Sequence, residues 1–139
     1  MFNETINCRK IVEGKAEGKV IVSKNPINFL AMVNLDTGKI TDQSHDLFNI
    51  SLKDKILVFP HSIGSSVGAY SIYALKTNNL GPKGIICTAK ADIITASGCA
   101  IANIPVVDKL EKDIHDFIKN ESRLILDATN QKIMVKNRN

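Results

Sequence analysis

Two short apolar runs, each followed by a segment of helical character, constrain the fold of this chain most. The run from Lys55 to Phe59 suits a central strand, and residues 67–76 then place Val, Tyr, Ile and Leu along one helical stripe. Residues 84–88 form a second such run. It precedes a segment from Ile93 to about Ala102, and Asp92 is positioned to cap that helix. This alternation predicts parallel pairing of the two strands, with helical crossovers.

The remaining segments are short, and most have the composition of strands. Extended segments are expected at 18–23, 27–33, 39–42 and 104–107, a short amphipathic helix at 109–119, and a closing β-hairpin within 122–136. The N-terminal part is thus β-rich, the middle alternates strand and helix, and the end is β. This order predicts an α/β fold, a β/β/α layered domain, with residues 1–139 forming a single domain.

Composition excludes several classes of function. The chain has 139 residues, of which 44% are hydrophobic, so one domain can bury a proper core. The net charge of +4 comes from basic residues that are scattered, apart from the tail at 132–138. Aromatic residues make up only 5% and Trp is absent, which argues against a base-stacking surface for nucleic acid. No apolar run is long enough to span a bilayer and the N-terminus lacks a signal-peptide pattern, so we expect a cytoplasmic protein.

The cysteines and most histidines do not form a recognisable metal-ligand pattern. Cys8, Cys87 and Cys99 are odd in number and contain no Cys-x-x-Cys pair, which argues against a disulfide framework or a zinc site. Cys87 and Cys99 are expected to be buried thiols, and Cys8 to lie near a loose end. His115 is expected to be exposed. His61 lies in the loop that presents Ser65 and could pair with it, but loop histidines are usually solvated. No metal site is predicted within this chain.

The segment Gly64-Ser65-Ser66-Val67-Gly68 is the strongest candidate for chemistry. It places a glycine and two serine hydroxyls between an expected strand and the start of an expected helix. Unpaired N–H groups and the helix dipole favour negative charge at such a position. Ser65 could be a simple helix cap, or its hydroxyl could be made easier to deprotonate. No complete active site can be assembled from the chain alone, which indicates a partner.

The motifs, taken in order, resemble the small subunit of the aconitase X group, a stand-alone form of the aconitase swivel domain. The resemblance covers roughly residues 11–108. It is carried by these residues: Gly14-x-x-x-Gly18-Lys19-Val20; Asn34-Leu35-Asp36-Thr37-Gly38-Lys39-Ile40-Thr41-Asp42-x-x-His45; Leu57-Val58-Phe59-Pro60; Gly64-Ser65-Ser66-Val67-Gly68-x-Tyr70-x-x-Tyr73; Leu80-Gly81-Pro82-Lys83-Gly84-Ile85; and Ala91-Asp92-x-Ile94-x-x-x-Gly98-x-x-Ile101-x-x-Ile104-Pro105-Val106-Val107-Asp108. The pattern of Tyr70 and Tyr73 looks most like the archaeal branch, which resembles phosphomevalonate dehydratase.

The resemblance implies a hydro-lyase that is active only with a large subunit, in a heterodimer. The implied reaction removes water from mevalonate 5-phosphate, a small phosphorylated hydroxy acid, to give trans-anhydromevalonate 5-phosphate in an archaeal mevalonate pathway to isoprenoids. The large subunit would hold a [4Fe–4S] cluster. The family's Gly-Ser pair falls on Gly64 and Ser65, which makes Ser65 the general base. Gly64, Ser66 and His45 are carried over as substrate-binding positions.

Three departures from the family pattern bear on the substrate. Ile63 stands where the family usually has Arg before Gly-Ser, Phe29-Leu30-Ala31-Met32 replaces a Gly-rich aromatic segment, and Cys87 stands where an Asn is expected. The change at Ile63 removes a possible anion clamp. Two alternatives follow, a hydroxyproline dehydratase of the same group and a non-catalytic swivel-type binding domain.

Overall fold

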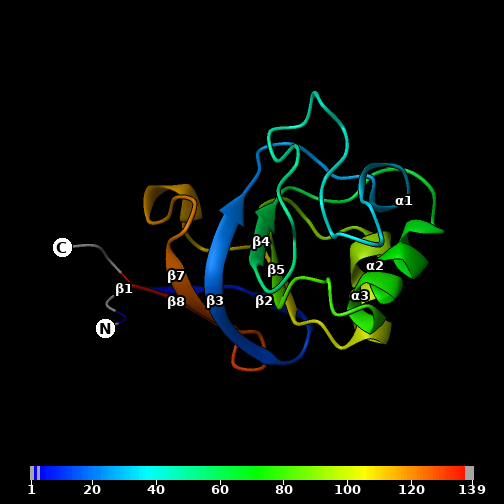
Figure 1. The fold of residues 1–139 in the computed structure, drawn as a ribbon. Helices are drawn as coiled ribbons and strands as arrows, with labels where there is room; N and C mark the ends of the chain where they lie inside the picture. The colour runs from blue at the N-terminus through cyan, green and yellow to red at the C-terminus, as the bar shows by residue number, and fades with distance from the viewer. Residues whose placement is uncertain (1, 3, 137–139) are drawn as a thin grey trace.

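The computed structural model describes residue 2 and residues 4–136, and its strands and helices alternate through the middle of the chain (Figure 1). The strands are β1 (Glu4–Asn7), β2 (Arg9–Val12), β3 (Lys15–Val22), β4 (Ile56–Phe59), β5 (Gly84–Cys87), β6 (Val106–Asp108), β7 (Arg123–Asp127) and β8 (Lys132–Val135). The helices are α1 (Phe29–Met32), α2 (Gly68–Thr77) and α3 (Ile93–Ala102), with a 3₁₀ turn at Ile114–Asp116.

A parallel unit of four strands forms the centre of the fold. Strands β3, β4, β5 and β6 lie side by side, and the register aligns Val22 with Val58, Val58 with Ile86, and Ile86 with Val107. Every residue of β4 and β5 is buried, as expected for strands covered on both faces. The two crossovers place α2 and α3 together on one side of the sheet, where they pack against each other (Figure 1). The predicted parallel pairing is confirmed.

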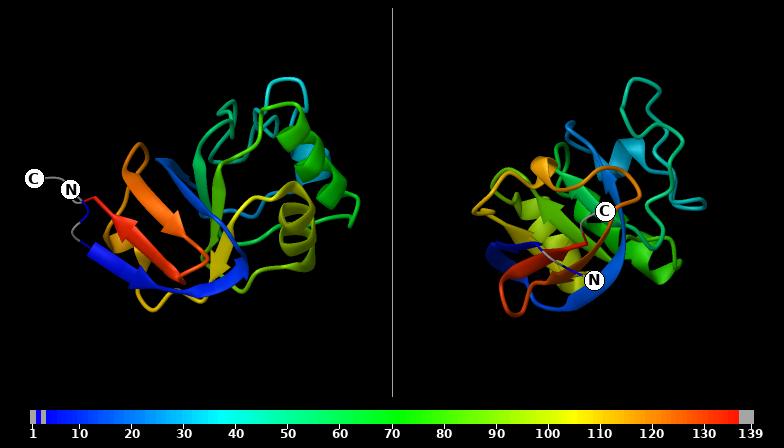
Figure 2. Two further views of the ribbon diagram at one scale, coloured as in Figure 1. Left: turned by 90° about the horizontal axis from the view of Figure 1, so that it is seen from below. Right: turned by 90° about the vertical axis from the view of Figure 1, so that its left-hand side faces the viewer.

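The sheet curls back on itself and so supplies the second β layer. Its strand order is β1-β8-β7-β3-β4-β5-β6-β2, so the first and last strands in this order are β1 and β2. These two strands are joined by the single residue Cys8, which brings the ends of the curled sheet together (Figure 2). The long strand β3 belongs to both layers, because Lys15–Lys19 pair with β7 and Val20–Val22 pair with β4. The observed architecture confirms the predicted β/β/α domain.

Two hydrophobic cores fill the spaces on either side of the central strands. The core between sheet and helices includes Ile21, Leu57, Phe59, Ile72 and Cys99. The core inside the curled sheet is built from the side chains that point the other way, among them Val20, Ile56, Val58, Ile86, Val107, Leu126 and Ile133. The alternation of neighbouring residues between the two cores follows from the two-residue period of a strand.

Several local expectations were wrong. Residues 27–33 are not one extended segment but contain α1, because the Asn28 side chain accepts a hydrogen bond from the N–H of Ala31 and caps a single helical turn. The helix expected at 109–119 shrinks to the 3₁₀ turn Ile114–Asp116, whose Ile114 is drawn into the core of the curled sheet. The strand expected at 39–42 is reduced to isolated bridges at Lys39 and Ile40.

The N-terminal segment is also more ordered than expected. Strand β1 pairs with β8, and β2 pairs with β6, so Cys8 lies between two paired strands and not near a loose end. Burial, followed by the charge of nearby Asp108, raises the pKa of Cys8 to about 12, which makes this thiol unreactive. Cys87 and Cys99 are buried as predicted, and burial raises the pKa of each thiol.

A buried carboxylate fixes β2 to the central sheet and predicts a stability effect. Asp108 is fully buried and accepts hydrogen bonds from Nε and Nη2 of Arg9, both at 2.8 Å, and from the N–H of Ala91 at 2.7 Å. Asp108→Asn leaves the guanidinium without its bidentate partner, so we expect the free energy of unfolding to fall by roughly 2 kcal/mol in urea denaturation. Lys19→Gln, which removes the exposed Lys19–Glu121 contact at 3.6 Å, should cost less than about 0.5 kcal/mol.

The effect of Asp108 should depend on pH in a defined direction. Burial would raise the pKa of Asp108, but the hydrogen bonds from Arg9 and from the Ala91 N–H outweigh it and hold the pKa below its ordinary value. A carboxyl whose pKa is lower in the folded state stabilises the fold above its unfolded pKa of about 4, and this stabilisation is lost as the pH falls through the folded pKa. The stability gap between the native chain and Asp108→Asn should therefore be full at pH 6 and narrow below about pH 4. A gap of constant size down to pH 2 would contradict this assignment.

Candidate active site

The loop after β4 presents Ser65 and Ser66 to solvent at the start of α2. Both side chains are exposed. The Ser65 Oγ accepts a hydrogen bond from the N–H of Val67 at 3.1 Å, and the Ser65 carbonyl accepts one from Gly68 at 2.9 Å. Ser65 therefore caps the turn that leads into α2, whereas the N-cap position of the helix itself is Val67 and has no side-chain cap. An N–H directed at Oγ stabilises negative charge on that oxygen and leaves the hydroxyl proton free to be lost.

Gly64 is required by the loop for two reasons. Its φ of +95° is unfavourable for any side chain, and a Cβ built on it would collide with the carboxamide of Asn28, at 2.7 Å from Cγ and 2.9 Å from Oδ1. The sequence indicated Gly64 but not Asn28. The only signal for Asn28 was its position three residues before Ala31, where Asn can cap a helical turn.

Asp92 anchors the same loop to α3. Its Oδ1 accepts hydrogen bonds from the Ser62 N–H at 2.7 Å and from the Thr95 hydroxyl at 2.8 Å, and its Oδ2 accepts one from the Thr95 N–H at 2.9 Å. The buried Ser62 hydroxyl bonds to the Thr95 hydroxyl as well. The interpretation of Asp92 as a helix cap is thus confirmed, and its contact with Ser62 holds the start of the Ser65 loop in place.

His45 lies one segment away from the loop and is buried. Its Nδ1 lies 3.0 Å from the Leu47 nitrogen and 3.1 Å from Oδ1 of Asp46, and its Nε2 lies 3.1 Å from the Pro26 carbonyl oxygen. The residue after Pro26, Ile27, is bridged to Ser62, so His45 supports the segment that flanks the Ser65 loop. A direct contact between His45 and substrate stays a prediction, and it would require one of these backbone contacts to open.

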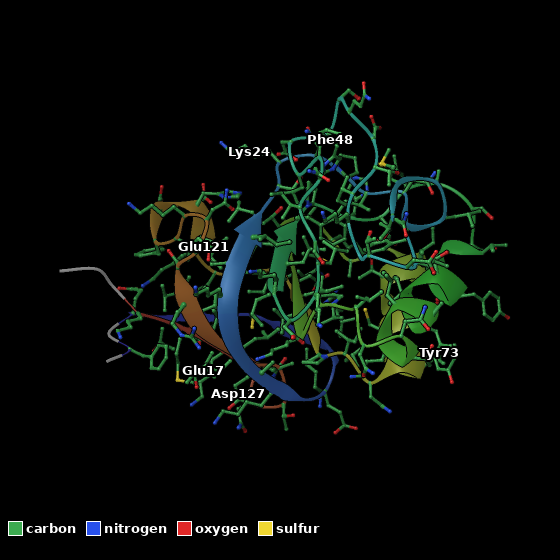
Figure 3. The ribbon with its side chains drawn as sticks, in the orientation of Figure 1. Glu17, Lys24, Phe48, Tyr73, Glu121 and Asp127 are labelled. Atoms are coloured by element: carbon green, nitrogen blue, oxygen red, sulfur yellow. The ribbon has the colours of Figure 1, made fainter. Side chains whose placement is uncertain are left out.

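Exposed apolar side chains are found on the segments that meet at the start of α2. They come from α1, from the loop, from α2 and from the start of α3, and the most exposed are Ile93 at 76% and Tyr70 at 70%. Leu30, Ile63 and Val67 complete this set, which we call the apolar rim. Tyr73 lies farther along α2, and Phe48 lies in the loop above β4 (Figure 3). Several large exposed apolar side chains near a polar loop are typical of a protein contact.

The described residues contain no cluster of three His, Cys, Asp or Glu side chains that could hold a metal ion. Cys87 and Cys99 belong to the core between sheet and helices, whereas Cys8 packs against the core inside the curled sheet. These thiols therefore do not fit an iron–sulfur cluster.

The part of the chain that the structure describes has no helix long and apolar enough to cross a membrane.

Comparison with known proteins identifies the family. The family model described as the aconitase X swivel domain matches residues 5–135. The chain belongs to the aconitase X swivel-domain family. The crystal structure of Thermococcus kodakaraensis aconitase X in its holo-form has a chain that superposes with a TM-score of 0.90 at 43% identity. The match covers 97% of the present chain and 100% of that one.

Relatives within the aconitase X swivel-domain family carry a more specific name. A protein of Methanococcoides burtonii named phosphomevalonate dehydratase small subunit is 43% identical over 129 residues, which are 93% of each chain. One of Thermococcus kodakarensis with the same name is 52% identical over 103 residues, covering 74% of this chain and 77% of that protein. Both relatives are thus named as the small subunit of a dehydratase.

Proposed function

We propose that this chain is the small subunit of an archaeal phosphomevalonate dehydratase and supplies its general base from Ser65. The observation that carries the proposal is the exposed Ser65 hydroxyl. Its oxygen accepts a hydrogen bond from the Val67 N–H just before α2, and the apolar rim lies on the segments that meet there. Near full-length similarity to small subunits of that name supports the substrate, mevalonate 5-phosphate. The enzyme would work in the cytoplasm, in an archaeal route to isoprenoids.

The reaction divides between the two chains. The Ser65 alkoxide removes a proton from C2 of mevalonate 5-phosphate, the C2 electron pair forms the C2–C3 double bond, and the C3–O bond breaks. The departing hydroxide takes up one proton to leave as water, and loss of the proton now on Ser65 restores the alkoxide, so the net change is loss of one water. The N–H of Val67 stabilises the alkoxide before the transfer, and Gly64 lets the backbone approach the substrate closely. A [4Fe–4S] cluster held by the large subunit would supply the Lewis acid for the leaving hydroxyl.

The large subunit docks on the apolar rim in this account. The rim gathers five exposed apolar side chains from four segments around one polar loop. Burying it would exclude water from Ser65, and in a water-poor site the Val67 N–H stabilises charge more effectively. The partner would also complete a site for which this chain supplies hydroxyls and backbone N–H groups.

Ile63 favours a second candidate, a non-catalytic binding domain, since an apolar side chain stands beside the serines where a cation would help to hold an anion. A hydroxyproline dehydratase is a further alternative within the same family. The retained Gly64–Ser65 geometry supports catalysis over the non-catalytic alternative, because the glycine permits a φ of +95° in the turn that exposes the Ser65 hydroxyl.

Co-expression with a candidate large subunit under anaerobic conditions tests the proposal. The isolated chain should be folded, colourless and inactive, whereas the co-purified pair should form trans-anhydromevalonate 5-phosphate from mevalonate 5-phosphate. Hydroxyproline is assayed alongside. Turnover of hydroxyproline alone would show that the chain belongs to a hydroxyproline dehydratase. A stable, cluster-loaded pair that turns over neither substrate would support the non-catalytic alternative.

A further inference from the structure

We propose that Asn28 is a substrate-binding residue, whose side-chain Nδ2 donates a hydrogen bond to an anionic oxygen of the substrate beside Ser65. The inference rests on the proposed function and deepens it. It assigns recognition of a carboxylate or phosphate oxygen to a neutral amide of this chain.

The orientation of the Asn28 carboxamide is fixed. Its Oδ1 accepts a hydrogen bond from the Ala31 N–H at 3.0 Å, and an N–H donor at that end identifies the other end as the NH₂ group. The carboxamide lies against Gly64, and Nδ2 is the nearest atom to the position that a Gly64 side chain would take. The cap of α1 and the absence of a side chain at Gly64 therefore hold this donor beside the Ser65 loop before any ligand arrives.

The Nδ2 donor is unused within the described part of the chain. No hydrogen bond from Nδ2 is found there, although Asn28 is only half-buried and its Oδ1 is engaged. Asp92 and His45 differ in this respect, since both oxygens of Asp92 and both ring nitrogens of His45 have partners. A preorganised donor loses little conformational entropy on binding, so its hydrogen bond contributes more of its strength to affinity.

The charge distribution around the loop makes such a donor important. The three segments that build this region, residues 27–33, 62–75 and 91–108, contain neither Lys nor Arg. The donors that these segments offer to an anion are therefore backbone N–H groups, hydroxyls and amides. Asn28 is the amide that contacts the glycine next to Ser65.

Asn28→Asp separates binding from structure because it changes little else. Aspartate keeps the acceptor for the Ala31 N–H and the volume against Gly64, and it caps helices as well as asparagine does. It replaces the free donor by a negative oxygen. In the assembled enzyme we expect KM for mevalonate 5-phosphate to rise about a hundredfold, with unchanged subunit assembly, cluster content and Tm, since a lost charge-assisted hydrogen bond alone costs tenfold or more.

Asn34→Asp is the matched control. Asn34 Oδ1 likewise accepts N–H bonds, from Asp36 at 2.7 Å and Thr37 at 3.2 Å, but its turn precedes Gly38 and makes no recorded contact with the Ser65 loop. Its KM should stay within about twofold of the native value, as for a surface substitution away from the site. Stabilisation of the complex by mevalonate 5-phosphate in a thermal-shift assay provides a second readout, which Asn28→Asp should abolish and Asn34→Asp should retain.

The outcomes of the inference and of the proposed function can be told apart. An unchanged KM and an unchanged ligand-induced Tm shift in Asn28→Asp would overturn the role of Asn28 while leaving the dehydratase intact. If the native complex used only hydroxyproline, the proposed substrate would be wrong. The role of Asn28 would then be tested by comparing the KM of the native and Asn28→Asp complexes for hydroxyproline, which also carries a carboxylate. A native complex inactive on both substrates would refute the proposed function and this inference together.

Discussion

Ser65→Ala should lower the turnover of the assembled enzyme by a factor on the order of a hundred or more while leaving assembly intact. The hydroxyl removed is the proposed base, and among the described residues its one hydrogen bond is that from the Val67 N–H at 3.1 Å. Losing that contact should reduce the free energy of unfolding by about 1 kcal/mol at most. Anaerobic steady-state kinetics, normalised to cluster content, measure the effect per intact molecule.

Ser66→Ala is the control for this substitution. Ser66 is the next residue and equally exposed, and its carbonyl accepts a hydrogen bond from the Ala69 N–H, but no bond to its Oγ is recorded. Its loss should therefore affect KM more than turnover. Near-normal turnover of Ser65→Ala, with a large loss for Ser66→Ala, would transfer the role of base to Ser66.

Gly64→Ala should have an effect of comparable size by a different route. The new Cβ would meet the Asn28 carboxamide and would sit on a backbone with φ of +95°, so the loop must shift. We expect a loss of roughly 1–3 kcal/mol in stability and, because the Ser65 hydroxyl moves with the loop, a fall in turnover of about a hundredfold. Urea denaturation and kinetics on the same preparation measure the two effects.

Gly18→Ala provides a matched glycine control in β3. A Cβ there would make only ordinary contacts, the nearest being the Asp54 carbonyl oxygen at 3.5 Å. Turnover of this variant should stay near the native value. Full activity of Gly64→Ala in a folded complex would show that the position of the Ser65 loop does not control catalysis.

The elements that were predicted correctly are those whose signal is local. The apolar runs of β4 and β5 are uniformly buried, and Asp92 caps α3 as its position before Ile93 indicated. Helix α1 was missed because four residues are too few to show helical periodicity, and its apolar sequence reads equally well as a strand. Strands β1 and β2 were missed because their partners, β8 and β6, lie at distant points of the sequence.

The same distinction applies to the candidate site. Gly64 and Ser65 stand together in the sequence, and their resemblance to a family motif identified them. Asn28 and Asp92 reach the loop only through the fold, one from α1 and the other from α3, and no spacing rule connects them to Ser65. His45 was placed in the site by resemblance, whereas its observed contacts are with the backbone at Pro26 and Leu47.

Isotope exchange at C2 of mevalonate 5-phosphate tests most directly the claim that Ser65 supplies the base. The cluster-loaded complex is incubated with substrate in D₂O, and the recovered substrate is analysed by NMR. The native enzyme should place deuterium at C2, because the proton taken by Ser65 exchanges with solvent before the reaction reverses. Ser65→Ala should leave C2 fully protonated while still binding the substrate, and exchange at the native rate in Ser65→Ala would contradict the account.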